Sequence, residues 1–142
     1  MKKILTLLLV PLMAFMACED EIDTPETDPR DELVGKWYVD EVTENNAHNY
    51  YEVSIAKGDP SDMLHIHNFA NISENLYAEV SLNGSSLTIP NQTVDGNDIE
   101  GSGSITDNFI DFTYTLDFGA GPSIIDATLS QEPIAKSLIV QK

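Results

Sequence analysis

Two histidines in this 142-residue chain have a spacing that could serve metal binding. His65 and His67 are one residue apart, so on a strand both imidazoles lie on one face, as metal-binding pairs in β-barrels often do. Leu64 and Ile66 hold the alternate positions, and because apolar residues face a core, we expect the histidines to face water. His48 stands in a different stretch, no third ligand is evident, and we therefore expect no metal site.

Other segments also fall short of a catalytic or cofactor site. Asp95-Gly96-Asn97-Asp98 carries oxygen ligands of the kind that calcium prefers, but it lacks the later glycine and distal glutamate of an EF-hand loop. The same residues suit a hairpin turn, which we favour. The chain has no G-x-S-x-G motif and no Ser or Asp that periodicity places beside a histidine. We expect no catalytic residue and no cofactor.

The N-terminus has the parts of an export signal. Lys2 and Lys3 give a positive start, and residues 4–16 form an uncharged apolar run. This run is too short for a transmembrane helix, which needs roughly 20 apolar residues. The only cysteine, Cys18, follows directly after Ala17. We therefore predict that residues 1–17 are a signal peptide.

Cys18 is the residue most clearly suited to a chemical role. Phe15-Met16-Ala17-Cys18 resembles a lipobox, where a diacylglycerol is attached to the cysteine and the peptide before it is removed. Phe15 and Met16 depart from that pattern, in which Leu and a small residue are commoner. The alternative is an incidental cysteine in a discarded peptide. The lipobox reading implies two acyl chains on Cys18, which suffice for stable membrane anchoring.

The charge of the chain limits its partners. After removal of residues 1–17, five basic residues face 24 acidic ones, a formal charge of −19. Nonspecific nucleic-acid binding needs a basic surface and is excluded, as is a basic patch docking on anionic lipid. The acidity suits a basic partner, or simply solubility. With Cys18 acylated no thiol remains, which excludes disulfides and thiol catalysis.

Residues 18–30 are predicted to be a disordered, lipidated tether. The stretch is acidic, carries Pro25 and Pro29, and has Ile22 as its one apolar residue after the cysteine. The run Glu19-Asp20-Glu21 looks like the surface-export signal of Bacteroidetes-type lipoproteins. That resemblance implies an outer-membrane lipoprotein exposed at the cell surface, with a periplasm-facing protein as the alternative.

Residues 31–142 are predicted to form one β domain, because apolar residues recur with period two. The clearest run has apolar residues alternating with Asp and Thr: Ile110, Phe112, Tyr114, Leu116 and Phe118. Asn83-Gly84 indicates a type I′ hairpin that would pair Val80 with Leu87 and Ala78 with Ile89. Such an alternating run predicts a strand with one buried face and one wet face.

Two irregularities are expected in this β domain. Pro90 and a change of parity before Val94 predict a bulge or bend between Pro90 and Thr93. With Asp107-Asn108 as the next loop, Gly103 falls opposite Phe112 and Gly101 opposite Tyr114. A glycine opposite an aromatic residue lets the ring lie over bare backbone.

We predict an all-β fold, an antiparallel up-and-down meander of about eight strands closing into a small barrel, with an open β-sandwich as the alternative. A further short apolar piece lies at residues 138–140. Gly35-Lys36-Trp37 resembles the G-x-W of lipocalin-like (calycin) barrels, where the tryptophan plugs the closed end. DELVGKWYV and SLTIPNQTVDGNDIEGSGSI make residues 33–131 similar to the small β-barrel domains of Bacteroidetes-type lipoproteins, a family without an agreed activity.

The leading functional hypothesis is a noncatalytic binding or accessory module at the cell envelope. Trp37, Phe112, Tyr114 and Phe118 are the candidate lining for a small apolar ligand, unless these rings fill the core completely. One alternative is an acidic inhibitor or capture protein for a cationic protein such as a lysozyme. A second is a weak hydrolase. The sequence indicates no particular oligomeric state.

Overall fold

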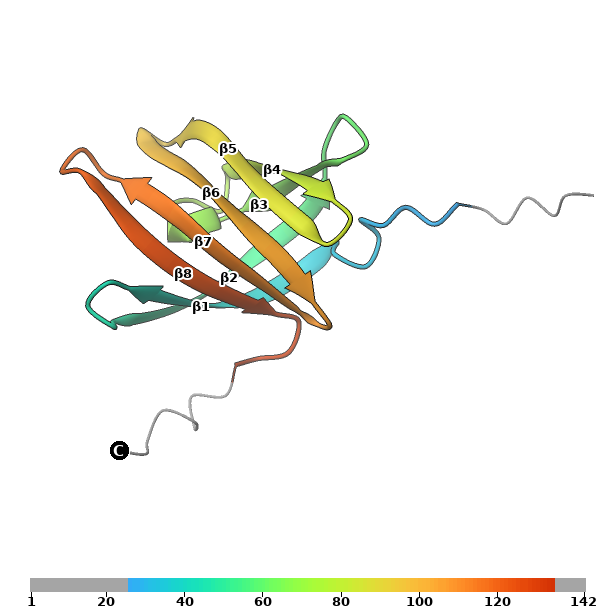
Figure 1. Ribbon diagram of the computed structural model, residues 1–142, viewed down its shortest axis with the longest axis horizontal. Helices are drawn as coiled ribbons and strands as arrows, with labels where there is room; N and C mark the ends of the chain where they lie inside the picture. The colour runs from blue at the N-terminus through green and yellow to red at the C-terminus, as the bar shows by residue number, and fades with distance from the viewer. Residues whose placement is uncertain (1–25, 135–142) are drawn as a thin grey trace, which may run out of the picture.

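Eight antiparallel strands form a closed barrel in the computed structural model, which describes residues 26–134 (Figure 1). Each strand pairs with the next, and β8 returns to pair with β1. The strands are β1 (Gly35–Thr43), β2 (His48–Lys57), β3 (Met63–His67), β4 (Tyr77–Asn83), β5 (Ser86–Val94), β6 (Asn97–Thr106), β7 (Phe109–Asp117) and β8 (Pro122–Ser130). The predicted meander and barrel are therefore confirmed, and the open sandwich is not formed.

Several expectations concern residues outside the described part. The predicted signal peptide (residues 1–17), Cys18 and the apolar piece at residues 138–140 lie there. Within residues 26–134, no helix is long and apolar enough to cross a membrane.

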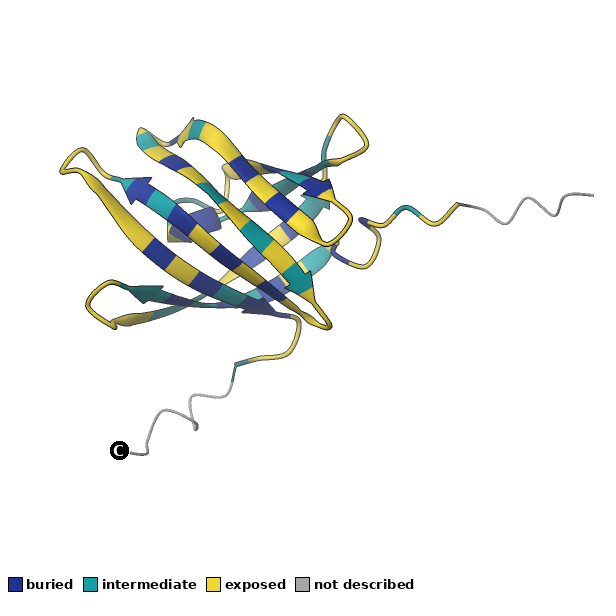
Figure 2. Ribbon diagram, in the orientation of Figure 1, coloured by how far each residue is buried: buried dark blue, intermediate teal, exposed yellow. Residues whose placement is uncertain are grey.

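The strands bury one face and expose the other, as period two predicts (Figure 2). On β7, Ile110, Phe112, Tyr114 and Leu116 are buried. The prediction that Phe118 continues this buried face is wrong, because Phe118 is 66% exposed and lies beyond the end of the strand. The chain turns before it: Oδ1 of Asp117 accepts hydrogen bonds from the backbone N–H groups of the next loop, which ends the alternation.

The hairpin between β4 and β5 differs from its expected register. Leu87 pairs with Leu82, two residues along from the predicted partner Val80. The central turn residues are Gly84 and Ser85, and only Gly84 has a positive φ, of 61°. Positive φ at the first central position alone is the type II′ pattern, which Gly permits. A displacement of two residues keeps every side chain on its predicted face.

The predicted irregularities of β5 and β6 are confirmed. The β5–β6 register shifts between Ile89 and Gln92, which places the bulge at Pro90 and Asn91. Gly101 lies opposite Tyr114, and Gly103 lies opposite Phe112. A Cβ atom at Gly101 would lie 2.5 Å from Cβ of Tyr114, and one at Gly103 would lie 2.5 Å from Cδ1 of Phe112. The bare backbone at these positions therefore makes room for the two rings.

One end of the barrel, which we term the clamped end, holds the start of β1, the end of β8 and residues 26–34. Trp37 is 2% exposed there, and its indole N–H donates to the carbonyl of Leu33 over 2.8 Å. Arg30, predicted to lie in a disordered tether, is 7% exposed instead. Its guanidinium donates to the carbonyls of Gly58 (2.9 Å) and Met63 (3.1 Å), so the folded part of the chain begins before residue 31.

The opposite end, which we term the mouth, holds four loops: residues 44–47, 68–76, 95–96 and 118–121. The 68–76 loop contains the single short helix of the described residues, η1 (Phe69–Asn71), a 3₁₀ turn. Asp95 and Gly96, in the 95–96 loop, both have positive φ, so the expected hairpin turn is present.

Candidate functional site

A buried carboxylate, Glu41, is the most unusual side chain of the barrel interior. It lies near the mouth end of β1 and is 5% exposed. The hydroxyl of Tyr51 donates to Oε2 of Glu41 over 2.7 Å, and that of Tyr114 donates to the same oxygen over 3.1 Å. Three strands, β1, β2 and β7, therefore bring one carboxylate and two phenols together. We refer to Glu41, Tyr51 and Tyr114 as the carboxylate cluster.

The tyrosines of this cluster are held in their hydrogen-donating form. Burial is the largest cause that raises the pKa of Tyr51 and of Tyr114 far above the ordinary value of 10.0, and the charge of Glu41 adds to it. Ionising either phenol would place a second negative charge in an apolar interior. Both hydroxyls thus stay protonated and keep donating to Glu41, as a buried carboxylate requires.

No cation balances Glu41 within the described residues. The three Lys and Arg side chains there all lie toward the clamped end, and each forms an ion pair elsewhere. Since both phenols donate to Oε2, the second oxygen of Glu41, Oε1, has no hydrogen-bond donor from residues 26–134. The cluster therefore offers an acceptor that is ready for a donor from outside the chain.

Glu41 borders a hollow at the mouth of about 430 Å³. We term this space the mouth hollow. Its polar lining comes from Glu41, Thr43, Asn49, Asn71, Asp95 and Asn97. Its apolar lining comes from Ala70, Ile72, Leu116, Phe118 and Ile125. Apolar walls with a few polar groups, at the mouth of a β-barrel, are typical of small-molecule sites, and the volume lies in the usual range.

The short helix η1 closes the interior below this hollow. Phe69 is 4% exposed, and its ring packs edge-on against Phe112, with the centroids 5.8 Å apart, and lies 4.8 Å from the ring of Tyr114. Asn68 and Ala70 take the left-handed backbone conformation on either side of it, with φ of 60° and 53°. The loop thus turns sharply to insert Phe69 between the strands. The middle of the barrel is consequently packed with side chains.

The four aromatic residues predicted to line a ligand site lie in three different places. Trp37 plugs the clamped end, while Phe112 and Tyr114 lie in the packed interior. Of these four residues, Tyr114 alone belongs to the carboxylate cluster, through the hydrogen bond of its hydroxyl to Glu41. Phe118 is exposed at the rim of the mouth hollow. The structure brings Tyr114 and Phe118 toward one site and leaves Trp37 outside it.

The predicted histidine pair lies on the outer surface, as expected. The ring of His65 stacks on Tyr77 with centroids 3.9 Å apart, and His67 lies 5.4 Å from the same ring. His48 is held by Asp40, with Nδ1 and Oδ1 2.8 Å apart. Among residues 26–134 no three His, Cys, Asp or Glu side chains come close enough to hold a metal ion.

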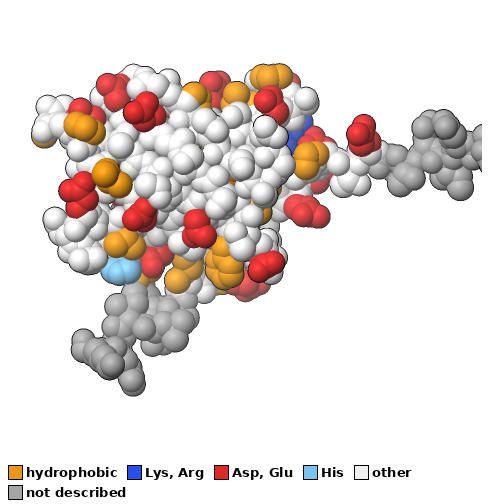
Figure 3. All heavy atoms as spheres, in the orientation of Figure 1, with side chains coloured by type: hydrophobic (Ala, Val, Ile, Leu, Met, Phe, Trp, Pro, Cys, Tyr) orange, Lys and Arg blue, Asp and Glu red, His pale blue; other side chains and the backbone are white. Residues whose placement is uncertain are grey.

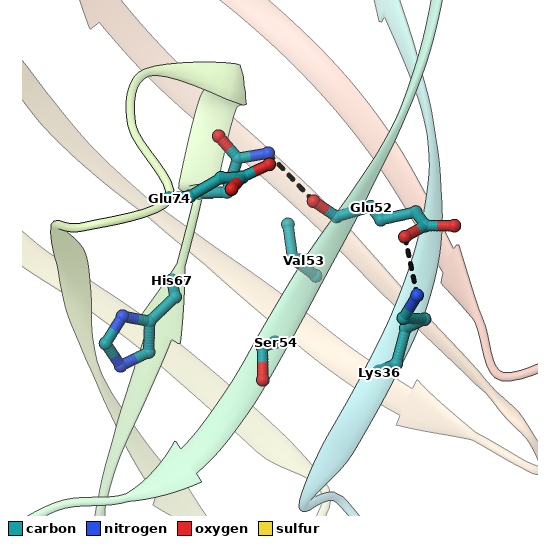
Figure 4. Close-up of a pocket in the computed structure, with 7 residues that line it drawn as sticks. Lys36, Glu52, Val53, Ser54, His67 and Glu74 are labelled. Atoms are coloured by element: carbon teal, nitrogen blue, oxygen red, sulfur yellow. Dashed lines mark hydrogen bonds and ion pairs between the residues drawn. The ribbon is translucent and has the colours of Figure 1, made fainter.

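A second, outer cleft of about 200 Å³ lies where β2 separates from the 68–76 loop (Figure 4). Lys36 donates to Glu52 over 2.8 Å, and the side-chain amide of Asn68 donates to the backbone carbonyl of Glu52. Ser54 and His67 also line this cleft. In the described structure no hydrogen bond joins the side chains of Ser54 and His67.

Glu41 and Tyr51 are the residues of this candidate site that were not predicted from the sequence. A parity signal was available, because Glu41 continues the buried series of Trp37 and Val39 at period two. An acidic residue on the apolar phase of a strand is uncommon and indicates a partner or a role. The contact with Tyr114 had no such signal, since it joins residues 73 positions apart.

Comparisons with known proteins bear on the fold alone. No protein-family model matches this sequence, and neither does any of the curated proteins with which it was compared. A solved structure described as a redesigned beta barrel is similar, with a TM-score of 0.51 at 14% sequence identity. The alignment covers 71% of this chain and 92% of that one. The chain is thus a small, eight-stranded antiparallel β-barrel, a conclusion that the strand pairing reaches independently.

Proposed function

We propose that this chain is a lipoprotein of the cell envelope whose barrel is a noncatalytic binding module for a small ligand at its mouth. Acyl chains on Cys18 would hold it on the outer membrane, and the acidic run after Cys18 favours the cell surface over the periplasm. The G-x-W at Gly35-Lys36-Trp37 and the closed meander support a lipocalin-like plan, in which one end is plugged and the other receives a ligand.

The observation that carries this proposal is the burial of Glu41. An ionised carboxylate in an apolar interior costs several kcal/mol unless it is well paired, and an apolar residue at the same position would often be as stable or more stable. Glu41 nevertheless lies between two phenols beside an open hollow. Ligand binding would explain why a carboxylate stands at this position, whereas its contribution to folding would not.

Binding can be tested with the full chain and an extract of small molecules from bacterial envelopes. Native mass spectrometry should detect a retained small molecule on the protein. Thr43→Trp, which would place a large side chain in the mouth hollow, should abolish that retention, whereas Thr88→Trp on the outer face of β5 should leave it unchanged. Protein without adducts, or equal retention by both variants, would contradict binding in the hollow.

The anchor can be tested separately. The wild-type protein should fractionate with membranes and carry the added mass of a diacylglycerol, because two acyl chains give stable insertion. Cys18→Ser should release it into the soluble fraction. Membrane association that persists in this variant would contradict lipidation at Cys18.

Capture of a cationic protein is the second candidate, and the surface charge favours it. Acidic side chains are spread over the face shown in Figure 3, while basic ones are visible only beside the N-terminal segment. Binding of lysozyme, a cationic probe, should then weaken steeply as salt rises. An affinity that does not change with salt would exclude this mechanism.

A further inference from the structure

The Lys and Arg side chains of the described residues all lie toward one end of the barrel, whereas acidic side chains lie at both ends. Arg30, Lys36 and Lys57, which are all the Lys and Arg of this region, lie in or beside the clamped end. Each of the four mouth loops instead contains or directly follows a carboxylate: Glu44, Glu74, Asp95 and Asp117. Low-dielectric walls lined by charges of one sign focus the electrostatic field. The mouth therefore attracts cations.

Glu41 is the carboxylate at which a cation in the mouth would bind. It lies at the border of the mouth hollow, and only 5% of its surface is exposed. Its Oε1 atom receives no hydrogen bond from the described residues. Asp95 adds a second carboxylate to the lining, and no Lys or Arg lies among the lining residues. A ligand with a carboxylate or phosphate would meet repulsion here, and a neutral ligand would leave the Glu41 charge unbalanced.

The rest of the lining selects the type of cation. Ile72, Leu116 and Ile125 give apolar walls, and Phe118 exposes an aromatic ring at the rim. A hydrated metal ion would gain no favourable contact from such apolar walls. An organic cation with a short apolar body could pack against them, and its charged head could also meet the face of an aromatic ring, a favourable contact.

We propose that the mouth hollow binds an organic ammonium group on a short apolar body, with the ammonium donating to Oε1 of Glu41. This inference rests on the proposed binding function and names its ligand class. Tyr51 and Tyr114 orient the carboxylate by occupying Oε2, so Oε1 is the oxygen that remains for the ligand. The asparagines of the lining, Asn49, Asn71 and Asn97, offer amide oxygens for the other ammonium protons.

A charge-matched ligand series tests the ammonium preference. The probes are 2-phenylethylamine, 2-phenylethanol and 3-phenylpropanoate, which share an aromatic body and differ in the charge of the head. Calorimetric titration of the full chain should show that the amine binds roughly tenfold or more tightly than the alcohol, with no detectable binding of the acid, because a charge-assisted hydrogen bond is about twice as strong as a neutral one.

Glu41→Gln is the decisive variant, because it keeps the shape and an acceptor for the two phenols while removing the charge. It should weaken amine binding roughly tenfold or more and leave alcohol binding unchanged. Glu79→Gln is the matched control, since Glu79 is exposed on the outer face of β4. A cooperative denaturation transition in both variants would show that neither has lost its fold.

Every outcome of the series decides the ligand class. Equal affinity for amine and alcohol, equal effects of the two variants, or no binding of any probe would overturn the ammonium proposal. The envelope-extract experiment is independent of these probes, so retention of another molecule would leave the binding module standing. Failure of both experiments would remove both proposals.

One further arm identifies the source of the ammonium, which can be a free amine or a lysine side chain of a protein. Lysozyme that displaces 2-phenylethylamine, and loses this ability when its lysines are acetylated, would indicate a lysine source. Amine binding that lysozyme leaves unchanged would indicate a free amine. Either result is compatible with the proposed chemistry.

Discussion

At the clamped end of the barrel a buried cation is surrounded by acceptors, whereas at the mouth a buried anion has two hydroxyl donors from the described residues. Arg30 donates to backbone carbonyls of the β2–β3 connection and forms an ion pair with Asp28 at 2.8 Å. Glu41 has no cationic partner in the described part of the chain. The charge at the clamped end is satisfied by the fold itself, and the charge at the mouth is satisfied only in part.

This difference separates what stabilises the barrel from what it offers to a ligand. A fully paired charged group fixes a chain segment in place, while a partly paired one costs stability and persists where it serves binding. Substitutions at Trp37, Tyr114 and Asp28 test the contrast between the two ends.

Trp37→Ala should destabilise the protein most, because it removes a fully buried indole and its hydrogen bond to Leu33 at the clamped end. Large aromatic-to-alanine changes in a core typically cost about 3–5 kcal/mol. Chemical denaturation should show this loss. At temperatures where the variant stays folded, binding at the mouth should be unchanged. A large loss of binding by folded protein would show that the two ends are coupled.

Tyr114→Phe should cost less, about 1.5–3 kcal/mol at neutral pH, because it removes one hydrogen bond to a buried charged group. The effect of this substitution on stability should be most distinctive at alkaline pH. The folded-state pKa of Tyr114 is raised above the unfolded value of 10.0, so its contribution is complete below pH 10 and is lost as the pH rises further.

Denaturation midpoints measured between roughly pH 10 and 11.5 provide the readout. The wild-type free energy of unfolding should fall more steeply with pH than that of Tyr114→Phe, by an amount that approaches about 1.4 kcal/mol per pH unit at the upper end of this range, since one titrating group has been removed. Parallel curves would show that Tyr114 ionises as easily in the folded barrel as in the unfolded chain.

Asp28→Asn should have the smallest effect on stability, and this effect should be seen at acidic pH. Hydrogen bonds from Arg30 are the main cause that holds the pKa of Asp28 below its ordinary value of 3.8. A depressed folded-state pKa contributes stability above the unfolded pKa, and this contribution is lost as the pH falls below it. Between roughly pH 5 and pH 2.5 the midpoint should fall less for Asp28→Asn than for the wild type. An identical fall would contradict the role of this ion pair.

The sequence could predict the barrel because strand parity is a local property. Phe112 and Tyr114 were placed on the inner face, opposite their glycines, from spacing and one turn. Phe118 was misplaced because Asp117 ends the strand through hydrogen bonds to a loop, which spacing does not reveal. Arg30 was misplaced because its acidic, proline-bearing surroundings resemble a tether, while its acceptors lie about 30 residues away.

The candidate site was much less predictable than the fold. The parity of Glu41 was visible in the sequence, but its meaning depends on the closure of β8 onto β1, which brings β7 near β1. The mouth hollow depends in addition on η1, whose residues have no strand or helix periodicity. Sites that form only on closure of a barrel leave no continuous pattern in the chain.

The described chain enters and leaves the barrel at the same pole, since β1 begins and β8 ends at the clamped end. A body tethered from one pole presents its opposite pole outward. A fluorescent probe or a surface linkage attached at residue 26 or residue 134 would therefore leave the mouth unobstructed. The same geometry would let this barrel stand on a membrane, or on a sensor chip, with its acidic opening directed toward the surrounding solution.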